Sequence, residues 1–405
     1  MKNRTLGGIL LVAGTATGAG MLALPISTGL SGFLPSLALF VIYWLYMTYT
    51  AFLFLEATLW LDQDTNLISM AQHTLGIFGK AAAWVSYLFL LYALTTAYIA
   101  GSTPIFVDTL QALTGWSAPY WVGAIPLLII FGFFVYQGAQ AVDYINRVLM
   151  IGLAIAYCTL LVLLTPSMQT DKLQHVDWRL LTVGISVVAT SFGFHIIIPT
   201  LANYLHRNVR QLILVIFAGS LIPLAVYTLW EIYALSIIPL EGANSITAGY
   251  LQGVNAAELM ADALSTPSLS LTARGFAFFA IVTSFLGVSL SLLDFLADGF
   301  KIKKSAGGKA LLYCLTFIPP LAIALTDPRA FLGALEYAGA FGVVILLGFM
   351  PALMVWRGRY HHCYPSLYTA PGGKPALAIT MLFSIMLIGI EIANKLGWLN
   401  PFANP

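Results

Sequence analysis

Two apolar segments of the chain are each interrupted by a run of small and helix-breaking residues. Residues 14–20 (GTATGAG) precede Pro25 in the first segment, and residues 191–195 (SFGFH) precede Pro199 in the second. Glycine in a membrane helix often serves only close packing. Where such a helix unwinds, however, its free N–H groups suit a carboxylate and its free carbonyls suit an ammonium or a cation. Together the two interruptions predict a site for a zwitterionic amino acid.

The composition of the chain indicates that these segments lie in a membrane. Hydrophobic residues make up 60% of the chain and charged residues only 8%, and the mean hydropathy is +0.89. Soluble domains carry about 25% charged residues, and a helix needs about 20 apolar residues to cross the hydrocarbon core. We therefore expect an all-α membrane protein with eleven transmembrane helices, at 6–30, 34–60, 81–108, 119–139, 146–166, 180–203, 210–238, 273–298, 308–326, 330–356 and 374–398.

The same sequence argues against several other classes of protein. A net charge of +2 without a basic tract does not suit a nucleic-acid partner. Cys158, Cys314 and Cys363 have no disulfide or metal-ligand spacing, and we find neither a phosphate-binding loop nor a filter-like segment typical of channels. We expect no enzyme activity, no metal, no cofactor and no obligate protein partner. The expected partners are a small-molecule substrate and membrane lipid.

The distribution of basic residues predicts the orientation in the membrane. On this segmentation thirteen of the 18 Lys and Arg residues fall on the side of the N-terminus, and five fall on the other side. Because cytoplasmic loops hold the excess of basic residues, the N-terminus is expected inside and the C-terminus outside. The longest exterior stretch, 238–271, is expected to hold a short helix from Asn255 to Leu264.

The two interrupted spans recur at matching places in two halves of the chain. Gly18 and Glu56 are 38 residues apart, as are Gly193 and Glu231. Five spans separate the two units, so the units run in opposite directions through the membrane. This layout is typical of a secondary transporter with two inverted five-helix repeats and a midplane site. We expect one transmembrane domain, 1–405, made of repeats at about 6–166 and 180–356 and an extra C-terminal helix at about 374–398.

Several stretches resemble a known family. Residues 12–25 (VAGTATGAGMLALP) resemble the first-helix signature of the amino acid-polyamine-organocation superfamily. Residues 1–7 (MKNRTLG), 92–99 (YALTTAYI), 190–195 (TSFGFH) and 284–288 (SFLGV) are similar to its hydroxy and aromatic amino acid permeases, and the likeness extends along the whole chain.

This resemblance implies a symporter of the bacterial inner membrane that imports tyrosine, or a related aromatic amino acid, with protons by alternating access. Tryptophan or a broader range of neutral amino acids is the alternative substrate. Some proton-coupled members of the superfamily carry a Lys in the fifth helix, whereas 146–166 holds Arg147 and no Lys. Sodium therefore stays the alternative coupling ion. Its oxygen ligands would be Ser284 and backbone carbonyls near residues 15–18.

The resemblance also implies how the substrate is held. Gly18, Ala19 and Gly20 would bind its carboxylate, and the backbone around 191–194 would bind its ammonium. An aromatic substrate further needs flat apolar walls and a partner for its polar group, although most aromatic residues in a bundle serve packing alone. The candidate substrate-binding residues are Thr15, Thr17, Gly18, Ala19, Gly20, Tyr92, Thr95, Thr96, Ser191, Phe192, Gly193, Phe194, Phe285 and Tyr337.

Four ionisable residues are proton-coupling candidates, because such groups are costly at membrane depth. They are His195, Glu56, Glu231 and Asp294. Each has a simpler account: His195 could bond neighbouring backbone, Glu56 and Glu231 could be interfacial charges, and Asp294 could belong to a surface ion-pair cluster.

A stripe of small and polar residues marks one face of the eighth span. Its members recur at spacings of 3, 4, 3 and 4, as residues on one helix face do. They are Ser284, Gly287, Ser291, Asp294 and Asp298. The stripe could line a substrate path or pack closely on the first span.

Overall fold

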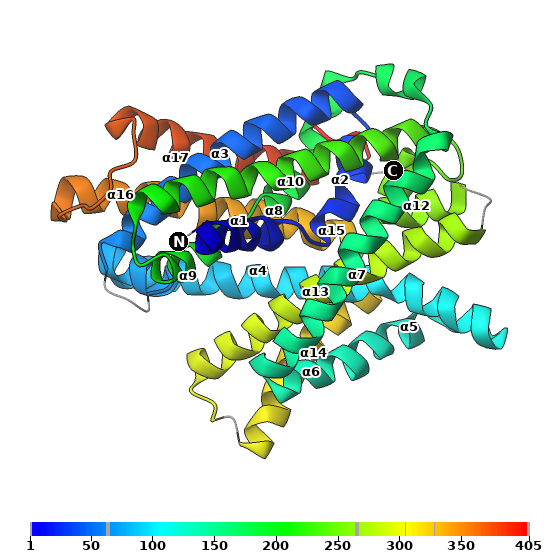
Figure 1. Ribbon diagram of the computed structural model, residues 1–405, viewed down its shortest axis with the longest axis horizontal. Coiled ribbons are helices and arrows are strands. Elements are labelled where there is room, and N and C mark those ends of the chain that lie inside the picture. Colours follow the sequence, from blue (N-terminus) through cyan, green and yellow to red (C-terminus); the bar gives the residue numbers. More distant parts are fainter. Residues whose placement is uncertain (1, 62–64, 264–266, 304, 328, 403–405) are drawn as a thin grey trace.

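The chain folds into a bundle of long helices, most of which run along the long axis of the computed structural model (Figure 1). The structure describes residues 2–61, 65–263, 267–303, 305–327 and 329–402. Within these residues every regular element is a helix. Ten are long and apolar enough to cross a membrane, and the bent pair α1 and α2 makes an eleventh span. The prediction of an all-α protein with eleven transmembrane helices is confirmed.

The first five spans follow the predicted order. They are α1 (Lys2–Ala16) with α2 (Gly20–Thr28), α3 (Phe33–Leu59), α4 (Leu67–Thr114), the continuous α5 (Tyr120–Pro126), η1 (Leu127–Phe131) and α6 (Gly132–Gln137), and α7 (Ala139–Leu164). Helix α4 begins well before the predicted residue 81, because a capping box at Asn66 and Ser69 starts an extra segment that kinks into the main helix at Gly76 (φ 75°).

The remaining spans are also interrupted in places. They are η4 (Trp178–Gly184), α8 (Ile185–Ser191), η5 (His195–Ile197) and α9 (Ile198–Tyr204); α10 (Val209–Ile237); α13 (Pro267–Phe300); α14 (Ala306–Thr326); α15 (Ala330–Tyr337), η6 (Ala338–Phe349), α16 (Met350–Arg357) and η7 (Gly358–His362); and α17 (Gly373–Lys395). The wide π-helical turns of η6 were not predicted. At Gly339 this element passes close to α8, since a Cβ there would lie 1.8 Å from the Ser186 carbonyl oxygen.

Short helices lie between the spans. They are η2 (Thr165–Ser167), η3 (Thr170–Gln174), α11 (Ile246–Gln252) and α12 (Ala256–Ala263). The short helix predicted within residues 238–271 is confirmed as α12, whose Glu258 N–H is capped by the side-chain oxygen of Asn255 at 3.1 Å. Leu264, its predicted last residue, lies outside the described residues, and α11 was not predicted.

The two breaks lie in the interior of the bundle, while the first half of α1 is partly exposed. In Figure 1, α1 and α8 are seen between α3 and α10 above and α4 below. Helix α1 packs on α10, α2 packs on α8 and α10, and α13 packs on α4 and α7. We call the end of the bundle where α1 begins and α3 ends the N-terminal face, and the other end the opposite face. The relation of the two halves as inverted repeats stays a prediction.

Candidate functional site

Both predicted interruptions are real breaks, and they touch each other. Helix α1 ends at Ala16, α2 begins at Gly20, and the two axes differ by 55°. Helix α8 ends at Ser191, and residues 192–194 are not helical. A Cβ on Gly20 would lie 2.9 Å from the Ser191 hydroxyl, so glycine permits the contact. The two unwound segments therefore face a common point.

The first break is linked to the polar stripe on α13. The Ala19 N–H donates to the Ser284 hydroxyl at 3.0 Å, and a Cβ on Gly18 would lie 2.6 Å from the same oxygen. The N–H at the start of α2 thus donates to a serine oxygen from another helix. The same N–H could instead hold the carboxylate of a bound ligand.

Tyr227 on α10 contacts both breaks, which the sequence did not reveal. Its side chain is fully buried, and its hydroxyl lies 2.7 Å from the Ala16 carbonyl oxygen and 2.8 Å from that of Ser191. These carbonyls belong to the last residues of α1 and α8. A single tyrosine in an apolar helix is usually a packing residue, so nothing in the local sequence distinguished this one.

The second break is lined by buried aromatic residues. Phe192 and Phe194 are each 1% exposed, and the Phe192 ring meets that of Tyr227 edge-on at 5.1 Å. A Cβ on Gly193 would lie 3.3 Å from Leu347 of η6. Three predicted residues of this segment, together with Ser191, therefore lie around the junction of the breaks.

Three of the four predicted threonines are bonded within their own helices. The hydroxyls of Thr15, Thr95 and Thr96 donate to the carbonyls of Leu11, Leu91 and Tyr92. Thr95 and Thr96 are buried in α4, whereas Thr15 and Thr17 are partly exposed beside the first break.

Tyr92 points away from the breaks. Its hydroxyl donates to the Leu315 carbonyl of α14 at 2.8 Å. That carbonyl has no helical donor, because Pro319 lacks an N–H four residues later. Tyr92 thus supplies the hydrogen bond that Pro319 cannot donate within α14.

Phe285 and Tyr337 are also directed elsewhere. Phe285 stacks on Phe317 of α14, with ring centroids 5.6 Å apart. Tyr337 is 43% exposed, and the Lys395 ammonium lies 4.6 Å from its ring centroid. The structure does not bring these two rings to the junction of the breaks.

Glu56 is held by a cation. It is fully buried, both of its oxygens accept from Arg359, and one also accepts the Ala370 N–H at 2.8 Å. It is therefore not an exposed interfacial charge.

Glu231 has a different environment. It is fully buried near the opposite end of α10, so it is not an exposed interfacial charge either. One oxygen is 2.7 Å from the Thr28 hydroxyl, and the other has no hydrogen-bond partner among the described residues. In that part of the chain no cationic side chain forms an ion pair with it.

His195 follows the second break and faces α3. Its Nε2 lies 2.9 Å from the Thr50 hydroxyl, and its Nδ1 has no partner among the residues described. The simpler account, a hydrogen bond from the ring to neighbouring backbone, is therefore not what the structure shows.

The polar stripe of α13 leads from the breaks to the N-terminal face. Ser284, Ser291 and Asp294 are partly exposed, while Gly287 and Asp298 are exposed. A Cβ added to Gly287 would meet no atom within 4 Å. At Gly287 the stripe therefore borders open space and is not packed against a neighbouring helix.

Comparison with known proteins decides the family. The model of the tryptophan/tyrosine permease family matches residues 1–391. The chain belongs to that family. It is 34% identical to tyrosine-specific transport system 1 of Haemophilus influenzae, with 99% of each chain covered. It is 32% identical to a tryptophan-specific transport protein of Pseudomonas aeruginosa, over 97% of this chain and 95% of the relative.

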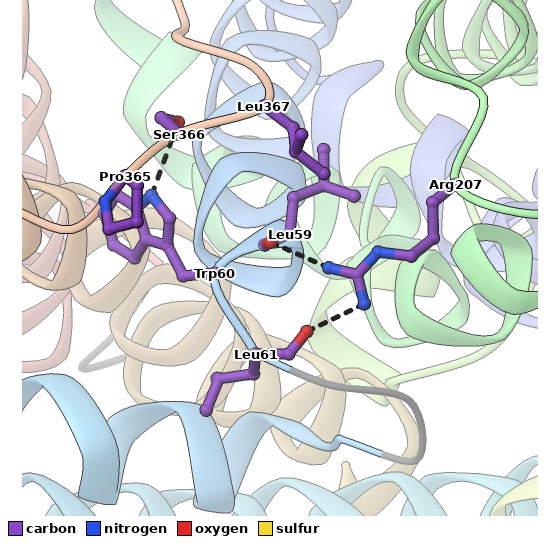
Figure 2. Close-up of a pocket in the computed structure, with 7 residues that line it drawn as sticks. All are labelled: Leu59, Trp60, Leu61, Arg207, Pro365, Ser366 and Leu367. Carbon is purple, nitrogen blue, oxygen red and sulfur yellow. Dashed lines mark hydrogen bonds between the residues drawn. The ribbon is translucent and has the colours of Figure 1, made fainter.

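One cavity of this permease lies at the N-terminal face, away from the breaks. It measures about 810 Å³ and is lined by residues 59–61, Arg207 and 365–367. Figure 2 shows the Arg207 guanidinium reaching the carbonyls of Leu59 and Leu61, at 2.7 and 2.8 Å. Arg207 thus caps the end of α3 and ties it to the end of α9.

The permease also carries a charged cluster that attaches α17 near the opposite face. Lys395 pairs with Glu336 of α15 and lies 3.6 Å from Glu391. The Ser186 hydroxyl of α8 donates to Glu391 at 2.7 Å. These contacts link the extra helix α17 to α15 and to the broken span that contains α8. The sequence did not indicate this connection.

Proposed function

We propose that this permease imports tyrosine together with protons across the bacterial inner membrane by alternating access, with its N-terminal face in the cytoplasm. The observation that carries the proposal is the meeting of the two breaks. They present the Ala19 N–H and the carbonyls of Ala16 and Ser191 at one junction. These groups match the carboxylate and the ammonium of an amino acid.

Glu231 is the residue that we assign to proton coupling. The Thr28 hydroxyl has one proton and lies within reach of both Glu231 and the Leu24 carbonyl, at 2.7 and 2.8 Å. The Leu24 carbonyl and the Glu231 carboxylate therefore compete for the Thr28 proton. Protonation of Glu231 ends the competition, because its own O–H can then donate to the Thr28 oxygen. Charged and without a cation at this depth, the carboxylate would be costly. Release of the proton would therefore favour a different arrangement of α2 and α10.

The exposed stripe of α13 supports a substrate path to the cytoplasm. A polar stripe at membrane depth suits water better than lipid. In this conformation the stripe connects Ser284, beside the breaks, to Asp298 at the N-terminal face. We take this as the route by which substrate leaves.

Tryptophan is the second candidate substrate. Two relatives at 32% identity are tryptophan-specific transport proteins, whereas two at 33% and 34% are tyrosine-specific. The phenol and the indole differ chiefly in one polar contact, so the choice between them depends on a few side chains.

Uptake into proteoliposomes tests the proposal. Labelled tyrosine is supplied with a proton gradient and a sodium gradient imposed separately, and with tryptophan, phenylalanine and leucine as competitors. We expect accumulation driven by the inward proton gradient and blocked best by unlabelled tyrosine. Accumulation driven only by sodium would overturn proton coupling, and best competition by tryptophan would reassign the substrate. No gradient-driven uptake by sealed vesicles with folded protein would overturn the function.

A further inference from the structure

Tyr227 makes the only contact, among those described, in which one side chain joins the carbonyls of both breaks. The carbonyls of Ala16 and Ser191 come from α1 and α8, which are separated by some 170 residues of chain. The hydroxyl comes from a third helix, α10. Its position therefore depends on three spans at once.

The position of this hydroxyl is fixed by packing. Tyr227 has no exposed surface, and its ring meets the Phe192 ring edge-on. One helical turn further along α10, Glu231 contacts Thr28 of α2. Helix α10 thus holds the first span on both sides of its break.

The hydroxyl cannot satisfy both carbonyls fully. A tyrosine O–H has one proton to donate, and two buried carbonyl oxygens lie within 2.8 Å of it. Two carbonyls that converge on one point form an acceptor-rich position, where a cation or an ammonium would also bind. The Tyr227 hydroxyl occupies this position, but it has one proton to donate and two carbonyl oxygens to satisfy.

We infer that Tyr227 is a positioning residue that holds the Ala16 and Ser191 carbonyls together until a substrate ammonium takes over one of them. An ammonium has three donors, so it can replace the shared proton on one carbonyl while Tyr227 keeps the other. The inference rests on the proposed function, since it needs a substrate with an ammonium group at this junction.

The test compares Tyr227→Phe with Tyr157→Phe in proteoliposomes. Tyr157 of α7 also donates to the backbone of α10, at the adjacent Val226 carbonyl and 3.1 Å away, so its loss controls for the removal of a hydroxyl. In Tyr227→Phe both carbonyls lose their donor, and we expect the KM for tyrosine to rise about tenfold with a smaller change in the maximal rate. We expect Tyr157→Phe to leave KM within about twofold of the wild type.

A third protein carries 4-aminophenylalanine at position 227, whose amine supplies two N–H donors on the same ring and can keep one carbonyl while the substrate ammonium takes the other. We expect it to return KM to near the wild-type value, a rescue that a role in packing alone does not predict. If Tyr227→Phe does not fold, the amino form decides: wild-type KM supports the inference, and failure to fold or transport overturns it.

The remaining outcomes are distinct. An unchanged KM in folded Tyr227→Phe overturns the inference and leaves the proposed function standing. Absence of uptake by the wild-type protein for both tyrosine and tryptophan overturns the proposed function, and this inference falls with it.

Discussion

At the scale of single residues, the buried Tyr227 and Glu231 of α10 each lie where two acceptors compete for one donor proton. Tyr227 offers one proton to two carbonyls, and the proton of Thr28 lies between Leu24 and Glu231. Buried polar groups are normally paired, and an unpaired one costs about 1–3 kcal/mol. Such shortages are therefore informative: each marks a place where a ligand or a proton can improve the hydrogen bonding.

The substitution Glu231→Gln tests the assigned proton carrier. The amide keeps an oxygen toward Thr28 and stays neutral, so we expect binding and tyrosine exchange across the membrane to persist. Proton-driven accumulation should be lost. With one proton carried per tyrosine, a gradient of one pH unit supports about tenfold accumulation in the wild type. Counterflow and gradient-driven uptake in the same vesicles measure the two activities.

Retained proton-driven accumulation in Glu231→Gln would rule out this assignment. Glu56→Gln is the matched comparison, since Glu56 lies at the same distance from the first break as Glu231 lies from the second, 38 residues after Gly18 and Gly193 respectively. Because it leaves the guanidinium of Arg359, 12% exposed, without its partner, we expect a loss of stability of about 3–5 kcal/mol. Thermal unfolding in detergent measures that loss.

At the scale of elements, α12 packs on α13 and is linked to α4 through Arg274. Arg274 of α13 lies 3.1 Å from Asp108 of α4 and 3.7 Å from Asp262 of α12. Glu258 of α12 adds a further carboxyl to this group. Burial, and then the charges of Asp108 and Asp262, raise the pKa of Glu258 to about 7 against the opposing effect of Arg274.

This raised pKa predicts how stability depends on pH. A carboxyl whose pKa rises on folding binds more protons in the folded state, so its contribution falls as the pH rises from about 4.5 to about 7 and is constant above that. The fall is at most about 3 kcal/mol. We expect Glu258→Gln to flatten the pH dependence of the unfolding temperature across this range and to be the more stable protein at pH 8.

Glu241→Gln controls for a general effect of charge, because Glu241 lies exposed in the same stretch between α10 and α13. Its profile should follow that of the wild type. Parallel profiles for the wild type and Glu258→Gln would show that α12 does not bury this carboxyl.

At the scale of the whole molecule, the proposed substrate path follows the stripe of α13 from the breaks to the N-terminal face. Gly287 borders open space on the stripe that leads to the N-terminal face. After replacement of the exposed Cys158, Cys314 and Cys363 by serine, we expect Gly287→Cys to react with a membrane-impermeant thiol reagent in inside-out vesicles. Tyrosine should slow the reaction by occupying the path.

Gly275→Cys is the control for this labelling. It adds a thiol to the same helix at another glycine with open space beside it, about 18 Å nearer the opposite face. We expect no reaction of Gly275→Cys from the N-terminal side. Labelling of Gly287→Cys only from the periplasmic side would reverse both the orientation and the direction of opening.

The sequence by itself determined the membrane class, the order of the eleven spans and the positions of both breaks. Each of these depends on local composition: an apolar run long enough to span lipid, or glycine and proline where a helix must end. The short helix α12 was likewise predictable from its own residues. Segment ends shifted where caps or wide turns intervened, as at Asn66 and in η6.

Only the tertiary structure decided which side chains meet. Glu56 and Arg359 are 303 residues apart, Tyr92 bonds to α14, and Tyr227 joins two breaks from a third helix. These contacts depend on how each helix is rotated about its axis. In a soluble helix the apolar stripe reports that rotation, but here lipid-facing and core-facing sides are both apolar. The sequence could therefore place the breaks along the chain, while the partners of their backbone groups followed from packing.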